Sequence, residues 1–211
     1  MEANLQKSRF FDFLLASNKP YLKNFEKWVF YPGMLFNSSE KWWGDKKKRP
    51  TAHEGIDLCY FKKADGQINN LDKNIKIPAT FSGNIVKTET DFLGKSIYLS
   101  HEIFSPCQRQ LYTIYGHTNP LTSIKARGKV EEGETIAVVS EFSREKTDIL
   151  PHLHLTFAWI PVPFPPGHLN WQNLTTNPRI TLIDPLSVLS PPTKRAAPAS
   201  PTSPPRSAAP E

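Results

Sequence analysis

The sequence predicts a mainly β protein whose strands form an antiparallel sheet, sandwich or partial barrel. From residue 55 onward the chain alternates between short β-prone runs and turns, which is typical of such folds. Glycine residues separate several of these runs. A chain of 211 residues is long enough for one domain with a hydrophobic core and some extensions. The expected strands cover residues 56–61, 75–77, 83–88, 95–100, 111–115, 135–140 and 153–159.

Three regions are expected along the chain. Residues 1–49 form an N-terminal helical arm and loop, because apolar residues at mixed three- and four-residue spacing predict short helices over 2–16 and 20–29. Residues 50–189 form the main domain. Residues 190–211 are mostly Pro, Ala and Ser, with too little apolar bulk to fold, so they are expected to be a disordered tail.

Charge and hydropathy exclude several classes of protein. The net charge of +6 comes partly from Lys46–Arg49, which is either a solvated loop or a surface that attracts an anionic partner such as cell-wall polymer. No nucleic-acid fold signature accompanies this run, so no nucleic-acid partner is expected. No apolar run reaches the roughly 18 residues of a membrane span. Phe10–Ala16 is interrupted by Asp12 and makes a poor signal peptide.

The cysteines predict little about the fold or the function. Cys59 and Cys107 are the only cysteines, so one disulfide is possible. Neither their number nor their spacing implies a disulfide framework or a cysteine metal site. A metal site in this chain would therefore use histidine and carboxylate ligands.

The segment Pro151–Phe157 draws most attention, since it places two histidines one residue apart in an apolar, β-prone run. On a strand His152 and His154 would project from the same face, roughly 6.5 Å apart by strand rise. That spacing would let one ring bind a metal while the other touches what the metal activates. Two ordinary strand histidines are the alternative.

A second group of candidate ligands is His53–Asp57. On a straight strand the two ends would lie about 13 Å apart, so Gly55 must allow a bend if both bind one ion. Two histidines and a carboxylate make a catalytic zinc set with a fourth position left for water. Alternatively, His53 is a surface-loop residue and Asp57 a turn acceptor. His117 ends the apolar run Ile114–His117 and is a third candidate, whereas His101 and His168 are assigned structural roles.

Taken in order, these motifs resemble the lysostaphin/LytM-type zinc endopeptidases. The resemblance covers roughly residues 50–160. The matching positions are His53–Asp57, Gly83–Val86, Ile97–His101, Tyr112–His117, Gly128, Val130, Gly133, Ile136 and His152–Leu155. It implies an antiparallel sheet with a groove that holds one zinc ion, and cleavage of peptide cross-links in bacterial peptidoglycan.

Carried over by motif, the resemblance implies that His53, Asp57 and His154 bind zinc and that His117 and His152 are the catalytic pair. It also implies a monomer that meets a peptide or peptidoglycan substrate in the periplasm or outside the cell. The chain departs from the family's usual pattern in a charged, Gly-free approach at residues 143–150. Because this approach borders the expected groove, the sequence leaves the identity of the substrate open.

Two other functions remain open at this point. A non-catalytic LytM-like module would bind cell-wall peptides or activate another hydrolase, although such modules typically lose zinc ligands. The run His154–Phe157 also fits the His-apolar-Thr-apolar motif of metal-free two-histidine phosphoesterases, whose fold needs two copies of it. A metal assay separates the phosphoesterase from the zinc peptidase.

Overall fold

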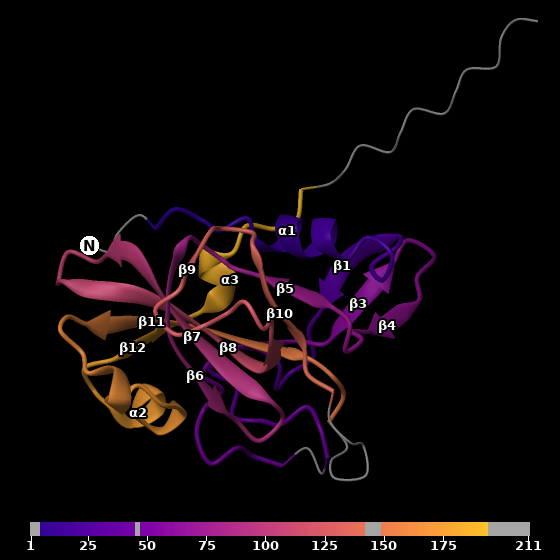
Figure 1. The fold of residues 1–211 in the computed structure, drawn as a ribbon. Helices are drawn as coiled ribbons and strands as arrows, with labels where there is room; N and C mark the ends of the chain where they lie inside the picture. Colours follow the sequence, from indigo (N-terminus) through magenta and orange to yellow (C-terminus); the bar gives the residue numbers. More distant parts are fainter. Residues whose placement is uncertain (1–4, 45–46, 142–148, 194–211) are drawn as a thin grey trace, which may run out of the picture.

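A computed structural model describes residues 5–44, 47–141 and 149–193. It is mainly β, as the sequence predicts, with short helices at both ends of the described chain (Figure 1). In chain order the elements are α1 (Phe10–Ser17), β1 (Phe25–Val29), β2 (Ile56–Leu58), β3 (Tyr60–Lys63), β4 (Ile68–Asn70), β5 (Lys76–Pro78), β6 (Gly83–Thr90), β7 (Lys95–Phe104), β8 (Arg109–Pro120), β9 (Lys129–Val130), β10 (Thr135–Val139), β11 (Leu153–Pro161), the 3-10 helix η1 (Pro166–His168), α2 (Trp171–Thr176), β12 (Thr181–Ile183) and α3 (Pro185–Val188).

Most strands join one large antiparallel sheet. Its main path runs β12-β11-β8-β7-β6-β9, while β10 pairs with both β5 and β8. Strand β11 lies beside β8 along its whole length. Its other edge is shared, because β2 pairs with the first part of β11 and β12 pairs with the second. This shared edge brings β2, β11 and β8 side by side at the point where the candidate site residues lie.

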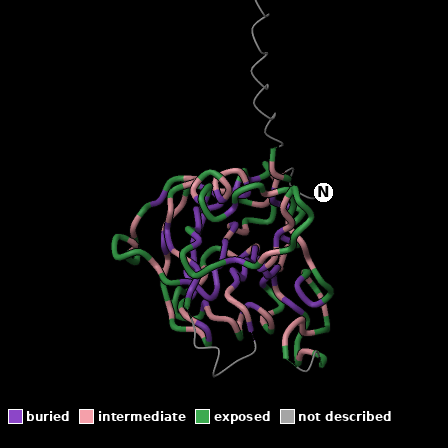
Figure 2. Tube along the Cα trace, turned by 90° about the vertical axis from the view of Figure 1, so that its right-hand side faces the viewer, coloured by how far each residue is buried: buried purple, intermediate pink, exposed green. Residues whose placement is uncertain are grey.

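The large sheet is covered on both faces. Leu155 of β11 and Tyr115 of β8 point into a main core that also holds Phe10 of α1 and Val188 of α3. The alternate side chains of the same strands point to a smaller cluster beside α2, which includes Ile114. Because both faces are covered, β7, β8 and β11 are buried along most of their length. Figure 2 shows buried segments gathered in the interior of the molecule.

The prediction of a second N-terminal helix over residues 20–29 is wrong, because the chain forms strand β1 there and this strand pairs with β3. A β-bulge between Phe25 and Lys27 inserts one extra residue into β1. Phe25 and Trp28 therefore share a face, with ring centroids 5.0 Å apart, and both pack against Phe61. The three-residue spacing that favoured a helix is produced here by a bulged strand.

The other predictions can be compared with the described residues. Strands cover each of the seven expected runs, and β1, β4, β9 and β12 are additional. Cys59 is buried and Cys107 exposed, and both are free thiols. No helix among the described residues is long and apolar enough to cross a bilayer. Most of the predicted tail, from residue 194, lies outside the described residues, as do Lys46 and most of the charged approach to β11.

Candidate metal centre

Strand pairing places the first two candidate ligands opposite each other. In the antiparallel register His154 of β11 faces Asp57 of β2 on one side and Gly116 of β8 on the other. Directly opposed side chains lie about 5 Å apart at Cβ, which lets a carboxylate reach an imidazole. The distance from His154 Nδ1 to Asp57 Oδ1 is 2.8 Å. Gly116 supplies no side chain, and a Cβ there would lie 3.3 Å from the His154 Cβ.

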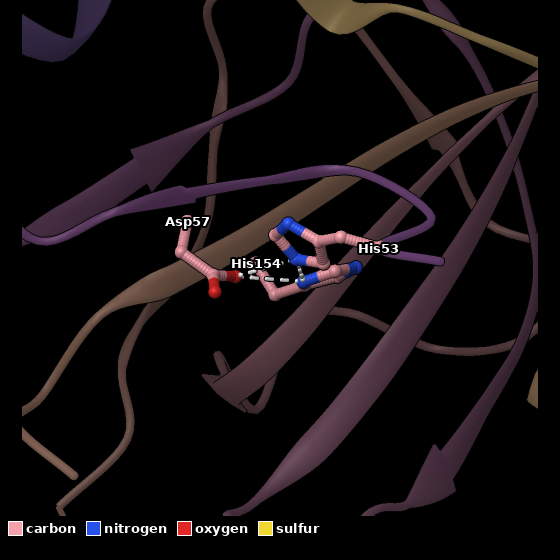
Figure 3. Close-up of side chains that lie close together, drawn as sticks. All are labelled: His53, Asp57 and His154. Atoms are coloured by element: carbon pink, nitrogen blue, oxygen red, sulfur yellow. Dashed lines mark hydrogen bonds and ion pairs between the residues drawn. The ribbon is translucent and has the colours of Figure 1, made fainter. Parts of the chain in front are cut away.

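His53 reaches the same point because the chain bends at Gly55, as the sequence predicts. A Cβ on Gly55 would lie 2.2 Å from the Leu155 carbonyl oxygen, so only glycine lets the chain pass this close to β11. The backbone of His53 is bonded on both sides to residues 37–38. The His53 ring consequently lies beside His154, with Nε2 3.1 Å from His154 Nδ1 and 3.3 Å from Asp57 Oδ1 (Figure 3).

These three atoms fit the donor set of a zinc ion. They are two imidazole nitrogens and one carboxylate oxygen, all buried and all facing one another. Zinc–nitrogen bonds of about 2.0–2.1 Å at tetrahedral angles hold ligand atoms about 3.3 Å apart, and the observed separations of 2.8, 3.1 and 3.3 Å are close to that. Three protein ligands leave the fourth position open, as in catalytic zinc sites.

The other nitrogen of each ligand histidine has a partner that suits metal binding. His53 Nδ1 lies 3.0 Å from the Leu35 carbonyl oxygen, which can only accept, so Nδ1 carries the proton and Nε2 keeps its lone pair. His154 Nε2 lies 2.9 Å from Thr156 Oγ1, to which it donates when Nδ1 serves as the ligand atom. Such outer partners orient the rings and fix their tautomers.

The second oxygen of Asp57 is held from outside the strands. Trp42 donates its indole Nε1–H to Oδ2 at 2.7 Å, and an Arg49 guanidinium nitrogen lies 3.5 Å from the same oxygen. Burial by itself would raise the pKa of Asp57, but its interactions with the neighbouring histidines, first with His53 and His152, hold it well below its usual value. Asp57 is therefore ionised, as a metal ligand must be.

His117 and His152 lie next to this cluster without belonging to it. Their ring centroids are 4.9 Å apart, and His152 Nε2 lies 3.8 Å from Asp57 Oδ1. His152 donates Nδ1–H to the Leu150 carbonyl at 2.8 Å, which leaves Nε2 with a lone pair. Burial lowers the pKa of His152 to about 3, so this ring is neutral near pH 7.

The site opens into a pocket of about 450 Å³. His117, His152 and His154 line it, together with Asp57, whereas His53 is fully covered. Apolar and aromatic side chains make up much of the remaining wall, namely Trp43, Pro50, Phe92, Ile149 and Trp171. A concave, mostly apolar site with a few convergent polar groups is the usual form of a substrate pocket.

A family comparison agrees with this geometry. The model of peptidase family M23 matches residues 51–166, more than half of the chain and all five candidate residues. The chain belongs to peptidase family M23. The lysostaphin/LytM-type resemblance is thereby confirmed, and the two-histidine phosphoesterase alternative is set aside. No curated protein matches the chain.

Several solved structures are similar to this M23 chain. One is cbpA from L. salivarius REN, with 13% identity, a TM-score of 0.43, and coverage of 77% of this chain and 87% of that one. Another is a mutant catalytic domain of the prophage-encoded M23 protein EnpA from Enterococcus faecalis, with 17% identity, a TM-score of 0.40, and coverage of 75% and 94%. Lysostaphin has 19% identity and a TM-score of 0.42, with coverage of 79% of this chain and 50% of its own.

The structure also shows site residues that the sequence did not single out. Trp42 donates a hydrogen bond to Asp57. Asp91 accepts hydrogen bonds from His117. Trp171 packs on His154, with ring centroids 5.1 Å apart. Trp42 and Trp171 lie outside the M23 match, and no local motif marks Asp91. His101 is bonded to Ser82 and Thr113 within the protein, as its structural assignment predicted.

Proposed function

We propose that this M23 protein is a zinc-dependent endopeptidase that hydrolyses peptide bonds in peptidoglycan cross-links. The observation that carries the proposal is the convergence of His53, Asp57 and His154 on one point, with His117 and His152 beside it in the same pocket. A non-catalytic module needs neither the complete ligand set nor the second pair of histidines. The lysostaphin/LytM resemblance supports peptidoglycan as the substrate.

Zinc held by His53, Asp57 and His154 would lower the pKa of a bound water molecule and polarise the scissile carbonyl group. His152 donates Nδ1–H to the Leu150 carbonyl and keeps a lone pair on Nε2, so it is placed to accept a proton from the attacking water. His117 donates Nδ1–H to the Asp91 carboxylate and lines the same pocket. Its Nε2 is therefore suited to pass a proton that it takes up during the reaction to the developing oxyanion or to the leaving amine.

Digestion of purified peptidoglycan tests the proposal. The zinc-loaded protein is incubated with purified peptidoglycan and with glycine-rich and D-alanyl peptides, and new amino termini are measured by mass spectrometry. Cleavage is expected, a chelator should abolish it, and added zinc should restore it. If the protein holds zinc but cleaves none of these substrates, the peptide-binding module becomes the better description.

The proposed function also bears on the domain boundaries, the oligomeric state and the location of the protein. We propose residues 50–189 as the catalytic domain, with 1–49 as an N-terminal arm, 190–211 as a tail, and a monomer as the working state. A cell-wall peptidase must meet its substrate outside the cytoplasm, so we propose a periplasmic or extracellular location. Fractionation that recovers the protein only from the cytosol would contradict both the location and the wall substrate.

A further inference from the structure

The Asp91 carboxylate, which is not one of the candidate metal ligands, accepts hydrogen bonds from two nitrogen atoms of His117. Asp91 follows β6 in the hairpin that leads to β7, and its side chain is 3% exposed. Its Oδ1 accepts Nδ1–H of His117 at 3.2 Å, and its Oδ2 accepts the backbone N–H of His117 at 2.9 Å. The two contacts fix the ring and the backbone of His117 together.

The backbone of His117 needs such support. Its φ is +61°, a left-handed conformation that is unfavourable for a residue with a bulky side chain. His117 lies within β8 at the edge of the pocket, where the pairing with β7 shifts register between Tyr115 and Thr118. A bond from the backbone N–H to a buried carboxylate stabilises this conformation, and the same carboxylate then sets the direction of the ring.

The carboxylate itself is fully engaged by donors. In addition to the two bonds from His117, Oδ1 accepts Leu93 N–H at 2.9 Å and Oδ2 accepts the Ser96 hydroxyl at 2.7 Å. Ser96 is completely buried and accepts the indole N–H of Trp171 at 3.0 Å. Each oxygen has two donors, so the carboxylate cannot rotate without breaking bonds.

Close packing also fixes the hairpin that carries Asp91. A Cβ on Gly94 would lie 2.7 Å from Ser140 Oγ and 2.9 Å from the Thr118 carbonyl oxygen, so the hairpin rests directly against the neighbouring strands. The Asp91 N–H is bonded to the Gly94 carbonyl at 3.0 Å. The carboxylate is thus presented to His117 from a rigid support.

We infer that Asp91 is a positioning residue for His117, which holds the proton on Nδ1 and leaves Nε2 free on the pocket side. The inference rests on the proposed function, because it assigns a role to His117 in peptide cleavage. A carboxylate can accept from both His117 donors, whereas an Asn amide presents its NH2 group to one of them. Asp91→Asn should therefore release the ring without changing the zinc ligands.

The test measures the ring directly as well as the reaction. In the zinc-loaded protein, ¹⁵N chemical shifts of the His117 ring show which nitrogen carries the proton. The parent is expected to hold it on Nδ1, and Asp91→Asn should give a mixture of tautomers. Its kcat should fall about 10- to 100-fold, the usual cost of losing such an orienting partner, with zinc content and KM almost unchanged.

Asp65→Asn is the matched control. Asp65 Oδ1 accepts the N–H of Gln67 at 3.0 Å in another hairpin, the same local turn that Asp91 makes with Leu93, but it has no contact with a histidine. This variant should keep the parent kcat and the parent His117 tautomer. A double mutant with His117→Ala adds a second control, because Asp91→Asn should cost nothing further once the ring is gone.

The possible outcomes test the positioning role of Asp91 separately from the proposed peptidase activity. If Asp91→Asn keeps the parent tautomer or the parent kcat, the positioning role is overturned, even though cleavage by the parent still supports the peptidase. If the parent cleaves nothing, the function fails and the ring shifts alone decide whether Asp91 orients His117. If Asp91→Asn does not fold, kcat is measured for Ser96→Ala instead, because this variant removes one of the hydrogen bonds that hold the Asp91 carboxylate. A partial fall in kcat supports the inference, and a parent-like kcat opposes it.

Discussion

The strands of the M23 core and the two segments that flank it supply different things to the same pocket. The core provides every candidate ligand and both additional histidines, all on β2, β8, β11 or the turns beside them. The flanks provide indole donors, Trp42 before the core and Trp171 after it. The core therefore carries the candidate ligand atoms, and both flanks add hydrogen-bond donors around them.

The two regions also differ in how their residues are brought together. In the core, strand register alone places His154 opposite Asp57. In the flanks, a loop and a short helix each bring one indole N–H to the site, to Asp57 Oδ2 and to Ser96, and the same loop also bonds to His53. Register is shared by every residue of a strand pair, whereas a single contact can be changed alone. The core should therefore tolerate substitution poorly and the flanks should allow graded effects.

Removing a core ligand should have the largest effect. His154→Ala takes away one of three donor atoms and leaves Asp57 and His53 unable to hold the metal alone. The purified variant should contain almost no zinc and show no measurable cleavage, while the parent holds about one zinc per chain. Metal analysis by mass spectrometry measures this. A zinc-free parent, or full zinc in the variant, would be incompatible with the proposed ligand set.

His117→Ala and His152→Ala should separate catalysis from metal binding within the core. Neither ring belongs to the donor cluster, so each variant should keep about one zinc per chain. General acid–base groups contribute about 10²–10⁴-fold in rate, and cleavage should fall by that factor. Parallel zinc analysis and peptide assays give both numbers. Normal cleavage by both variants would show that the roles are assigned to the wrong residues.

The contrast between core and flanks also explains what could be predicted from the sequence. His152 and His154 share a short motif, and the two-residue period of a strand predicts that they point the same way. By comparison, Trp42 lies 15 residues from Asp57, Asp91 lies 26 residues from His117, and Trp171 lies 75 residues from Ser96. Contacts over such separations leave no periodic signal, and only the folded chain shows them.

Strand β1 shows a different limit of the sequence. Its apolar residues have the spacing of a helix face, and periodicity over so few residues cannot distinguish a helix from a bulged strand. Tertiary pairing with β3 decides the outcome, because it lets Phe25 and Trp28 pack on Phe61. The main sheet was predictable because the chain alternates between β-prone runs and turns, several of which contain glycine.

Trp42→Phe tests whether the N-terminal flank orients Asp57, and a moderate loss of zinc affinity is expected. The ring at position 42 also contacts His152 edge-on, with centroids 5.2 Å apart, and phenylalanine keeps an aromatic ring there. The indole N–H is lost, so Asp57 Oδ2 keeps only the longer contact to Arg49. Zinc affinity should fall about 10-fold, the lower end of the usual cost for such a partner.

Trp43→Phe is the control for this change, since Trp43 stacks against Arg49 and lines the pocket without bonding to Asp57. Competition with a chelator of known affinity measures zinc binding in both variants. The control should match the parent. Equal zinc affinity in Trp42→Phe and the parent would mean that the flank covers the site without orienting Asp57, and the division between core and flanks would lose its support on this side.

The smallest effect is expected at the C-terminal end of the chain. Removing residues 191–211 takes away little apolar bulk, so folding and peptide cleavage should remain nearly unchanged. One contact is lost with it, because Thr193 donates its N–H and its hydroxyl to Asp12 Oδ1 in α1 at 2.8 and 2.9 Å. Exposed hydrogen bonds of this kind are at the low end of the usual range, about 0.5 kcal/mol each.

A second truncation keeps residues 191–193 and removes only 194–211. It separates the contribution of the Thr193 hydrogen bonds from that of the rest of the tail. It should melt with the parent, whereas the longer truncation should melt at most a few degrees lower, since about 1 kcal/mol shifts the melting temperature of a chain this size by about 2–4 °C. Thermal unfolding followed by circular dichroism gives both values. A drop of more than a few degrees in the variant that lacks only residues 194–211 would mean that residues beyond 193 take part in the fold.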